Sequence, residues 1–211
     1  MLDAHRNVRD AIRYDNATQV WYCWGQRSGK LRVMSKIGIP EFVIRSRTHV
    51  TKSLVVSSNT QDIGYPVLAD ATLDLSAQGY GTTQISGGHY SWGNSSGYTF
   101  DYDALLNRHK RLELPRTYDA IFLDELDWQT DGLLCLRTAK SILKPGGLLF
   151  VSSSPQKKDG VVLTSIAALE GVPGVHLSHL STWEVDPSIT RDTLPNRDDF
   201  FSRDFAAFRR T

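Results

Sequence analysis

The sequence is poor in cysteine and contains no long apolar run. Its 211 residues include only two cysteines, Cys23 and Cys135, and these lack the C-x-x-C spacing of a zinc or redox motif. Two isolated cysteines predict buried thiols in a reducing compartment and exclude a disulfide framework. No apolar run approaches the roughly 20 residues of a membrane-spanning helix, and the amino terminus shows no apolar stretch typical of a signal peptide. We therefore expect a cytoplasmic protein that does not contact membranes.

An excess of charge is also missing, because 24 basic residues nearly balance 23 acidic ones. Overall charge therefore gives no reason to expect binding to nucleic acid, although a local basic patch is compatible with it. Hydrophobic residues make up 40% and charged residues 22%, which is typical of globular proteins. The length favours a single domain over residues 1–211.

Buried strands and helices alternate along most of the chain. The strands are expected at residues 18–24, 41–45, 65–71, 118–125 and 147–154. The helices are expected between them, at residues 31–38, 48–64 and 130–144, and Gly38 and Pro40 are expected to end the first of these helices. This alternation predicts a largely parallel sheet with right-handed crossovers. Two strand-like stretches, 175–185 and 199–210, predict an antiparallel hairpin at the carboxyl terminus.

Residues 73–117 interrupt this alternation with a segment rich in glycine, serine and aromatic residues. The segment predicts an insertion or a lid, because long irregular loops in compact domains are often functional. A β-hairpin without a chemical role is the alternative. His89 lies in the segment among aromatic residues and is a candidate base that closes over an acceptor. A plain surface histidine is the other interpretation of His89.

The stretch "SILKPGGLLFVSSSP" (141–155) combines a helix end, a tight turn and a buried strand. Pro145 stops the helix, and Gly146 and Gly147 allow the turn. This order resembles the class I S-adenosylmethionine-dependent methyltransferases. The resemblance implies an α/β fold with a seven-stranded, mostly parallel, doubly wound Rossmann-like sheet and an antiparallel C-terminal hairpin. It also implies S-adenosylmethionine as the cofactor and a small molecule or RNA as the methyl acceptor, and it leaves a homo-oligomer or larger assembly open.

The resemblance places the cofactor against seven residues: Cys23, Gly25, Arg27, Gly29, Arg45, Asp70 and Ala71. Asp70 would face the adenine amino group, but Arg27 replaces a glycine and Arg45 replaces the carboxylate that binds the ribose. Arginine cannot accept hydrogen bonds from a ribose diol. Three interpretations stay open: a divergent methyltransferase, a relative with a phosphorylated ligand, and a cofactor-less scaffold or assembly subunit.

A second resemblance concerns "GQRSGK", "AIFLDE" and "FVSSSP", which are similar to the Walker A, Walker B and coupling segments of viral DNA-packaging ATPases. In the pattern G-x-x-x-x-G-K-[ST], Trp24 would replace the first glycine and Leu31 the metal-binding hydroxyl. The next expected strand begins at Glu41, which leaves little room after Lys30 for the helix that follows a phosphate loop. The sequence thus favours the methyltransferase, with the P-loop ATPase as an alternative.

Two carboxylates, Asp124 and Glu125, close the expected strand 118–125. Ligands of open parallel sheets bind at the carboxyl ends of the strands, so both residues are catalytic candidates, Asp124 before Glu125. The alternative for Asp124 is an interaction with the dipole of the following helix. His176 and His179 have no third ligand in view, so we expect no metal site.

Overall fold

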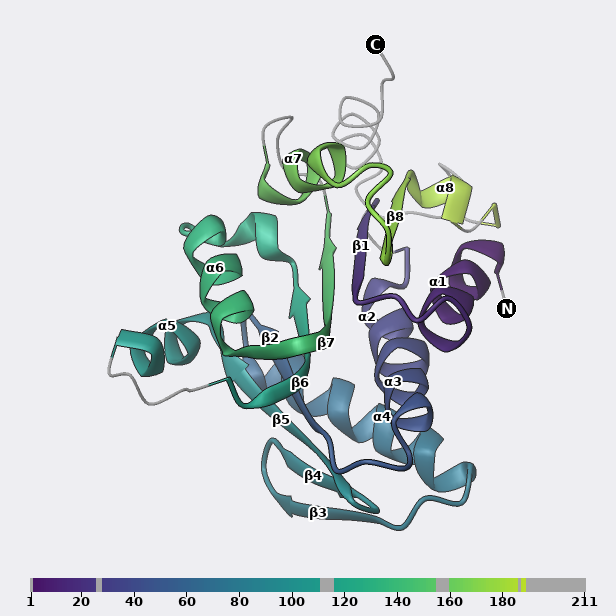
Figure 1. Cartoon of the computed structure of the whole chain (residues 1–211), viewed down its shortest axis with the longest axis vertical. Coiled ribbons are helices and arrows are strands. Elements are labelled where there is room, and N and C mark those ends of the chain that lie inside the picture. The colour runs from purple at the N-terminus through teal and green to yellow at the C-terminus, as the bar shows by residue number, and fades with distance from the viewer. Residues whose placement is uncertain (1, 26–27, 111–115, 155–159, 186, 189–211) are drawn as a thin grey trace.

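The computed structural model describes residues 2–25, 28–110, 116–154, 160–185 and 187–188. These residues form one eight-stranded sheet in the order β3-β4-β5-β2-β6-β7-β1-β8 (Figure 1). The strands are β1 (Gln19–Trp24), β2 (Lys52–Ser57), β3 (Thr82–Ser86), β4 (His89–Trp92), β5 (Ser95–Asp101), β6 (Tyr118–Asp124), β7 (Leu143–Ser153) and β8 (Val175–Leu180).

Six strands of the sheet are parallel, and only the hairpin edge is antiparallel. β4 pairs antiparallel with both β3 and β5, whereas β5, β2, β6, β7, β1 and β8 follow one another in parallel. The predicted α/β class with a mostly parallel, doubly wound sheet is confirmed. The antiparallel part of the sheet lies at the β3–β4 edge. At the opposite edge, where the antiparallel hairpin was expected, β8 runs parallel to β1. The second stretch of the predicted C-terminal hairpin, 199–210, lies outside the described residues.

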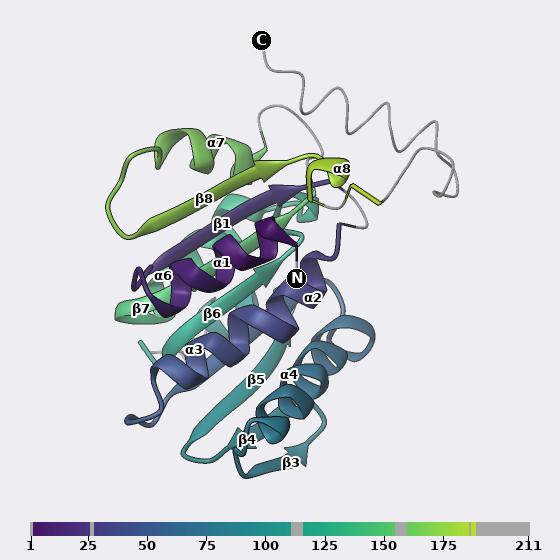
Figure 2. The same ribbon diagram turned by 90° about the vertical axis from the view of Figure 1, so that its right-hand side faces the viewer.

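Helices cover both faces of the sheet (Figure 2). Helices α1 (Asp3–Arg13), α2 (Lys30–Val33), α3 (Ile39–Arg45) and α4 (Tyr65–Ala77) lie on one face. Helices α5 (Tyr102–Lys110), α6 (Gly132–Ile142) and α7 (Val161–Ala168) lie on the other. The short elements are η1 (Met34–Gly38), η2 (Thr60–Gly64), η3 (Leu126–Trp128) and α8 (Thr182–Val185). None of the helices in the described ranges is long and apolar enough to span a bilayer.

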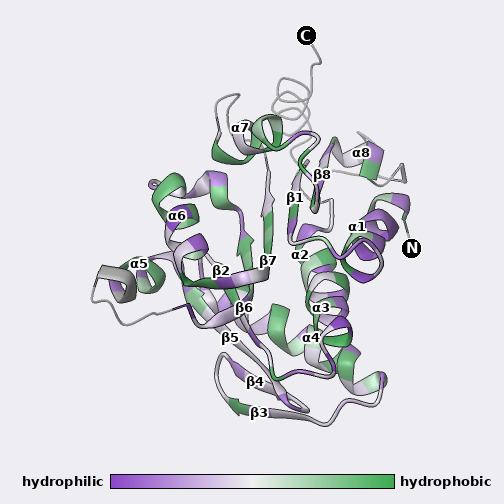
Figure 3. Ribbon diagram, in the orientation of Figure 1, coloured by the Kyte–Doolittle hydropathy of each residue, from purple (hydrophilic) through white to green (hydrophobic). Residues whose placement is uncertain are grey.

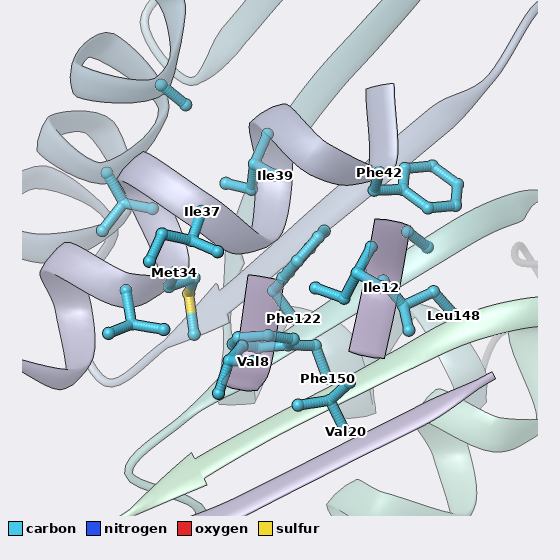
Figure 4. Close-up of a cluster of buried hydrophobic side chains, with 14 of the residues drawn as sticks. Val8, Ile12, Val20, Met34, Ile37, Ile39, Phe42, Phe122, Leu148 and Phe150 are labelled. Carbon is cyan, nitrogen blue, oxygen red and sulfur yellow. The ribbon is translucent and has the colours of Figure 1, made fainter. Parts of the chain in front are cut away.

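Each central strand contributes to two hydrophobic cores, because successive side chains point to opposite faces of a sheet. In β6, Ala120 and Phe122 face α1, α3 and α4, whereas Ile121 and Leu123 face α5, α6 and α7. The middle of β6 and β7 is accordingly hydrophobic (Figure 3). Figure 4 shows Phe122 and Phe150 beneath the helical segment that carries Ile37 and Ile39. Burial on both faces explains the unbroken apolar runs of the sequence.

One helical segment extends from Lys30 to Arg45, since α2, η1 and α3 follow without a break. The prediction that Gly38 and Pro40 end this helix and that 41–45 is a strand is therefore wrong. Pro40 lies just after the π-helical η1, and such a departure from α-helical hydrogen bonding is where a helix accommodates a residue without an N–H. At Gly38, a Cβ atom would lie 3.0 Å from Phe150 Cζ and 3.1 Å from Phe122 Cε1. Gly38 thus allows the helix to pack closely on the sheet, and it does not end the helix.

The two expected elements that follow are also exchanged. The expected helix 48–64 contains β2, whose Leu54, Val55 and Val56 are fully buried. The expected strand 65–71 is the first part of α4, with Pro66 in its opening turn. A short apolar run suits a buried strand and a buried helix equally, so one misplaced helix end shifted both neighbours.

The position of β1 contradicts a methyltransferase arrangement. In the Rossmann order the first strand lies between the second and the fourth, and β6 is the fourth parallel strand of this chain. Here β7 separates β1 from β6, and β1 pairs with β7 and β8. The loop after β1 therefore lies next to the end of β7.

Within residues 73–117, the described part comprises the end of α4, the β3–β4 hairpin, β5 and α5. β5 pairs in parallel with β2 from Lys52↔Ser96 to Ser57↔Asp101, so part of the expected insertion belongs to the sheet. That this segment acts as a lid stays a prediction.

Candidate functional site

The carboxyl ends of β1, β6 and β7 bring a lysine, a glutamate and a serine together; we call this end of the sheet the carboxyl edge. Gly29 adopts a φ of +82° just before the helix that begins at Lys30. This left-handed conformation favours glycine and turns the chain from the β1 loop into the helix. Lys30 thereby meets Glu125 at the end of β6 and Ser154 at the end of β7.

The ammonium group of Lys30 is buried, with 6% of the residue exposed. Its Nζ atom donates hydrogen bonds to the carbonyl oxygen of Gly25 (3.1 Å), that of Trp24 (3.4 Å) and Ser154 Oγ (2.8 Å). Glu125 Oε1 lies 3.4 Å from the same atom. Lysine is almost never buried without partners. The four oxygen atoms around Nζ therefore hold the Lys30 ammonium in one defined position, unlike a lysine on the surface.

Glu125 adopts a left-handed backbone conformation, with φ 50° and ψ 49°. Such a conformation is strained for a residue other than glycine and persists only where its surroundings enforce it. Ser154 provides two of these contacts, since its backbone N–H and its hydroxyl donate to the carboxylate at 2.6 and 2.9 Å. The carboxylate is thus held in one orientation beside Lys30.

Asp124 lies one residue earlier and is 2% exposed. Ser152 Oγ donates a hydrogen bond of 2.8 Å to its Oδ1 atom. Burial, together with the charge of Glu125, raises the pKa of Asp124 to about 7. A carboxyl group with such a pKa exchanges its proton near neutral pH, and a cation bound nearby would favour its charged form.

Trp24 stands immediately before the loop and is fully buried. Its Nε1 atom donates a hydrogen bond to Ser178 Oγ (2.8 Å), and its ring stacks on His5 with centroids 5.8 Å apart. The loop therefore starts from an anchored side chain at the position where the Walker A pattern has its first glycine.

The described residues that were expected to bind a cofactor lie on different elements. Cys23 is fully buried in β1, and Gly25 and Gly29 lie at the carboxyl edge. Ala71 is fully buried in α4. Arg27 lies outside the described residues.

Arg45 and Asp70 have structural partners elsewhere. Arg45 Nη1 donates to the carbonyl oxygens of Ile12 and Ala17, which ties α3 to the end of α1. Asp70 belongs to α4, not to a strand, and forms an ion pair with Lys36 at 2.6 Å. Arg45 and Asp70 thus lie on helices and not at the ends of strands, where the methyltransferase resemblance placed them.

His89 lies in β4, where its ring stacks on Tyr98 with centroids 4.2 Å apart. β5 and β2 separate β4 from β6, which carries Asp124. The structure therefore brings Asp124 and Glu125 together at the carboxyl edge and places His89 elsewhere.

Sequence reasoning missed Lys30, Ser152 and Ser154 as site residues. A signal existed, because a Gly-Lys pair follows the first apolar strand and three serines follow the last apolar residue of β7. Serine in a strand is only weakly informative, and only the adjacency of β7 to β1 and β6 gives these hydroxyl groups their partners.

Comparison with known proteins identifies the fold. No family model matches the sequence, and no curated protein matches it. The solved large terminase of a thermophilic bacteriophage, in complex with ADP, is similar over 90% of this chain and 48% of its own, with a TM-score of 0.67 and 12% identity. A variant of the large terminase ATPase domain of Thermus phage P74-26 is similar over 95% of this chain and 92% of its own, with a TM-score of 0.59 and 16% identity.

The large terminase of bacteriophage HK97 is similar over 100% of this chain and 44% of its own, with a TM-score of 0.58 and 17% identity. The chain spans about half the length of this terminase and of the ADP-bound one. At these identities the likeness shows the fold, and that fold is the one of large terminase ATPase domains.

The methyltransferase interpretation is therefore wrong, and so are S-adenosylmethionine as the cofactor and methyl transfer as the activity. The strand order and the terminase fold both contradict them. The comparisons give no support to a small-molecule or RNA acceptor.

Proposed function

We propose that the chain is a nucleoside-triphosphate-binding ATPase domain of the viral DNA-packaging type. The observation that carries this proposal is the buried Lys30 ammonium, 3.4 Å from Glu125, at the carboxyl edge of a terminase-like sheet. The helical segment from Lys30 to Arg45 removes the spacing objection, because it supplies the helix that follows a phosphate loop.

The β1 loop offers the groups that bind phosphate. A loop that runs into a helix amino terminus presents backbone N–H groups to an anion, and a lysine at its end adds a full positive charge. In the structure, Lys30 donates to the carbonyl oxygens of Trp24, the last residue of β1, and of Gly25, the first residue after it. We expect the β- and γ-phosphates to replace these carbonyl contacts, since phosphate oxygens are stronger acceptors.

Glu125 is the group that would accept a proton from the attacking water. A general base must lie within hydrogen-bond reach of the water, directly or through one other water. Glu125 lies beside Lys30, so a phosphate bound by Lys30 would lie next to this carboxylate. The two hydrogen-bond donors of Ser154 hold the carboxylate in place. Ser154 is therefore a positioning residue, and Glu125 is the catalytic one.

The residues fit a magnesium ion with one protein ligand fewer than the Walker A pattern has. Leu31 occupies the hydroxyl position and offers no oxygen, but Asp124 provides a carboxylate at the carboxyl edge. Mg²⁺ is commonly held by one or two carboxylates together with waters and substrate phosphates. When bound, the ion neutralises charge that develops on the phosphates.

Two of the similar terminase structures from the thermophilic bacteriophage are complexes with ADP and ATP-γ-S, which supports a nucleotide as the ligand here. We propose viral DNA as the packaged substrate and a larger assembly as the setting, because the fold is that of terminase ATPase domains.

The test compares Lys30→Ala with Lys36→Ala. Both lysines lie on the segment from Lys30 to Arg45, but Lys36 forms its ion pair with Asp70 away from the carboxyl edge. We expect the wild type to bind ATP in calorimetry and to release phosphate with Mg²⁺. Lys30→Ala should lower the hydrolysis rate by about 100-fold or more, and Lys36→Ala should leave it unchanged. Absence of ATP binding by the wild type at millimolar nucleotide, or an unchanged rate in Lys30→Ala, would contradict the proposal.

A further inference from the structure

A basic pocket lies at the other end of the sheet, where β7 begins and β1 starts. Its volume is about 430 Å³. Its walls include three cationic side chains, Arg116, Lys140 and Lys144, and the turn Pro145–Gly147. Thr18 and Gln19, at the start of β1, complete one side. We call this end of the molecule the amino edge.

The K-P-G-G sequence builds one wall of this pocket through an irregular pairing of β6 with β7. Tyr118 pairs with Leu143, and the next pair is Ala120 with Leu148. A single residue of β6, Asp119, thus stands opposite four residues of β7, Lys144 to Gly147. Gly146 adopts a φ of +74°, and a Cβ atom there would meet nothing within 4 Å. The extra residues therefore project from the amino edge and carry Lys144 and the exposed turn with them.

The three cations are only partly neutralised. Lys144 Nζ donates to both carboxylate oxygens of Asp119 at 2.9 and 3.0 Å. Arg116 and Lys140 form no ion pair with a carboxylate of the described residues, and both are exposed. The ammonium of Lys140 lies over the ring of Trp21, with Nζ 5.7 Å from the ring centroid. Within the described part of the chain, two positive charges thus stand at the rim of a cavity without a carboxylate to balance them.

From this geometry we propose that the amino edge binds the phosphate groups of a nucleic-acid backbone. Arginine and lysine are the residues that most often bind backbone phosphates, and they do so without reading sequence. A planar guanidinium suits two oxygens of one phosphate, and Lys140 and Lys144 provide point charges beside it. The near-zero overall charge of the chain does not oppose this assignment, because binding depends on the local patch.

An acidic protein surface is the competing partner, and the surroundings of the pocket speak against it. Protein interfaces bury aromatic or aliphatic anchors at their centres. The large hydrophobic side chains exposed among the described residues, such as Trp128, Leu133 and Leu73, lie elsewhere, and none of them lines this pocket. The two leucines that line the pocket, Leu143 and Leu149, are half-buried and buried, so the cations are its exposed charged groups and suit a polyanion better.

The pocket is separate from the nucleotide site proposed above, although β7 connects the two. Gly147 lies at the pocket and Ser154 at the carboxyl edge, about 23 Å apart along an extended strand. Binding at the amino edge therefore does not depend on ATP hydrolysis, and each site can fail its test alone.

The experiment measures binding of a fluorescent duplex of about 30 base pairs by anisotropy as the salt concentration is varied. The test variant is Arg116→Glu/Lys140→Glu, and the control is Arg6→Glu/Arg9→Glu on α1, which has the same change in net charge. We expect the test variant to weaken binding by about tenfold or more and to reduce the slope of log affinity against log salt by roughly 2. The control should match the wild type. ATP hydrolysis should be unchanged in the test variant.

Three results would overturn the assignment: no duplex binding by the wild type, equal binding by the test variant, or an equal loss in the control. A fourth arm adds polyglutamate as a competitor at the same charge concentration as the duplex. Displacement of the duplex by polyglutamate at equal charge would assign the pocket to an acidic protein instead.

Discussion

The carboxyl and amino edges of one sheet both present lysines, but in opposite environments. At the carboxyl edge, Lys30 is 6% exposed and has four oxygen partners. At the amino edge, Arg116 and Lys140 are exposed, and Lys144 forms an ion pair with Asp119. A buried, fully coordinated cation suits one small ligand in one orientation, because its position is fixed before the ligand arrives. Exposed cations suit a long polyanion that can approach in several registers.

The sharpest test of this contrast is Glu125→Gln. Glutamine keeps the shape of the side chain but cannot accept a proton, so ATP hydrolysis should fall by about 100-fold to 10,000-fold. Nucleotide affinity measured by calorimetry and duplex affinity measured by anisotropy should stay near the wild-type values. A loss of duplex binding equal to the loss of hydrolysis would show that the two edges are one site.

A second test concerns the helix that carries Lys30. Gly38→Ala should lower the free energy of unfolding by about 1–3 kcal/mol, because the new methyl group would press on Phe150 and Phe122 at 3.0 and 3.1 Å. Gly81→Ala is the control, since a Cβ atom there meets nothing within 4 Å. Urea denaturation measures both. Equal stability of the two variants would mean that the helix is not packed on the sheet at Gly38.

A third test uses pH to probe burial at the carboxyl edge. The pKa of Asp124 is raised from 3.8 to about 7, so the folded protein holds a proton between these values that the unfolded chain releases. Stability contributed by this group is therefore present at low pH and is lost as the pH rises toward 7. Asp124→Asn lacks this titration, so it should gain stability relative to the wild type by more than about 1 kcal/mol between roughly pH 5 and pH 8.

Chemical denaturation at the two pH values measures this difference. A pH-independent difference between Asp124→Asn and the wild type would mean that the carboxylate is solvated, and the contrast in burial between the two edges would then fail.

The smallest expected effect concerns the missing metal ligand. Leu31→Thr restores a hydroxyl group directly after Lys30, and we expect it to tighten Mg²⁺-dependent ATP binding about threefold to tenfold. Leu73→Thr is the control, because Leu73 lines the same 700 Å³ cavity as Leu31 and is exposed. Titration of each variant with ATP, in the presence and absence of Mg²⁺, measures the Mg²⁺-dependent gain in affinity. An equal gain in the control would assign the effect to lower surface hydrophobicity.

Much of the fold could be predicted from apolar runs. The strands β1 and β6 and the helix α6 lie within their expected ranges, β7 covers most of its expected range 147–154, and Asp124 and Glu125 stand at the end of β6. These elements are long or strongly patterned, and their ends carry clear turn residues. The helix expected at 31–38 is confirmed, but the elements expected at 41–71 are wrong, because Gly38 and Pro40 look like a helix end, whereas the packing of Gly38 on Phe122 and Phe150 keeps the helix intact.

The site was predicted only in part, because its members come from three strands whose order the sequence does not state. Glu125 and Lys30 are recognisable as a carboxylate and a lysine near strand ends. Their 3.4 Å separation, and the two hydrogen bonds from Ser154 to Glu125, exist only because β7 lies between β1 and β6.

By itself, the sequence determined that the chain forms an α/β sheet buried on both faces, since apolar runs of strand length recur between helical stretches. Tertiary structure alone decided where β1 is inserted in the sheet. Its place beside β7, and not beside β6, decides which strand lies next to the loop that follows β1. The physical reason is that hydrophobic burial is satisfied by several strand orders with similar local patterns. The choice among them depends on contacts between distant residues, such as Lys30 with Ser154.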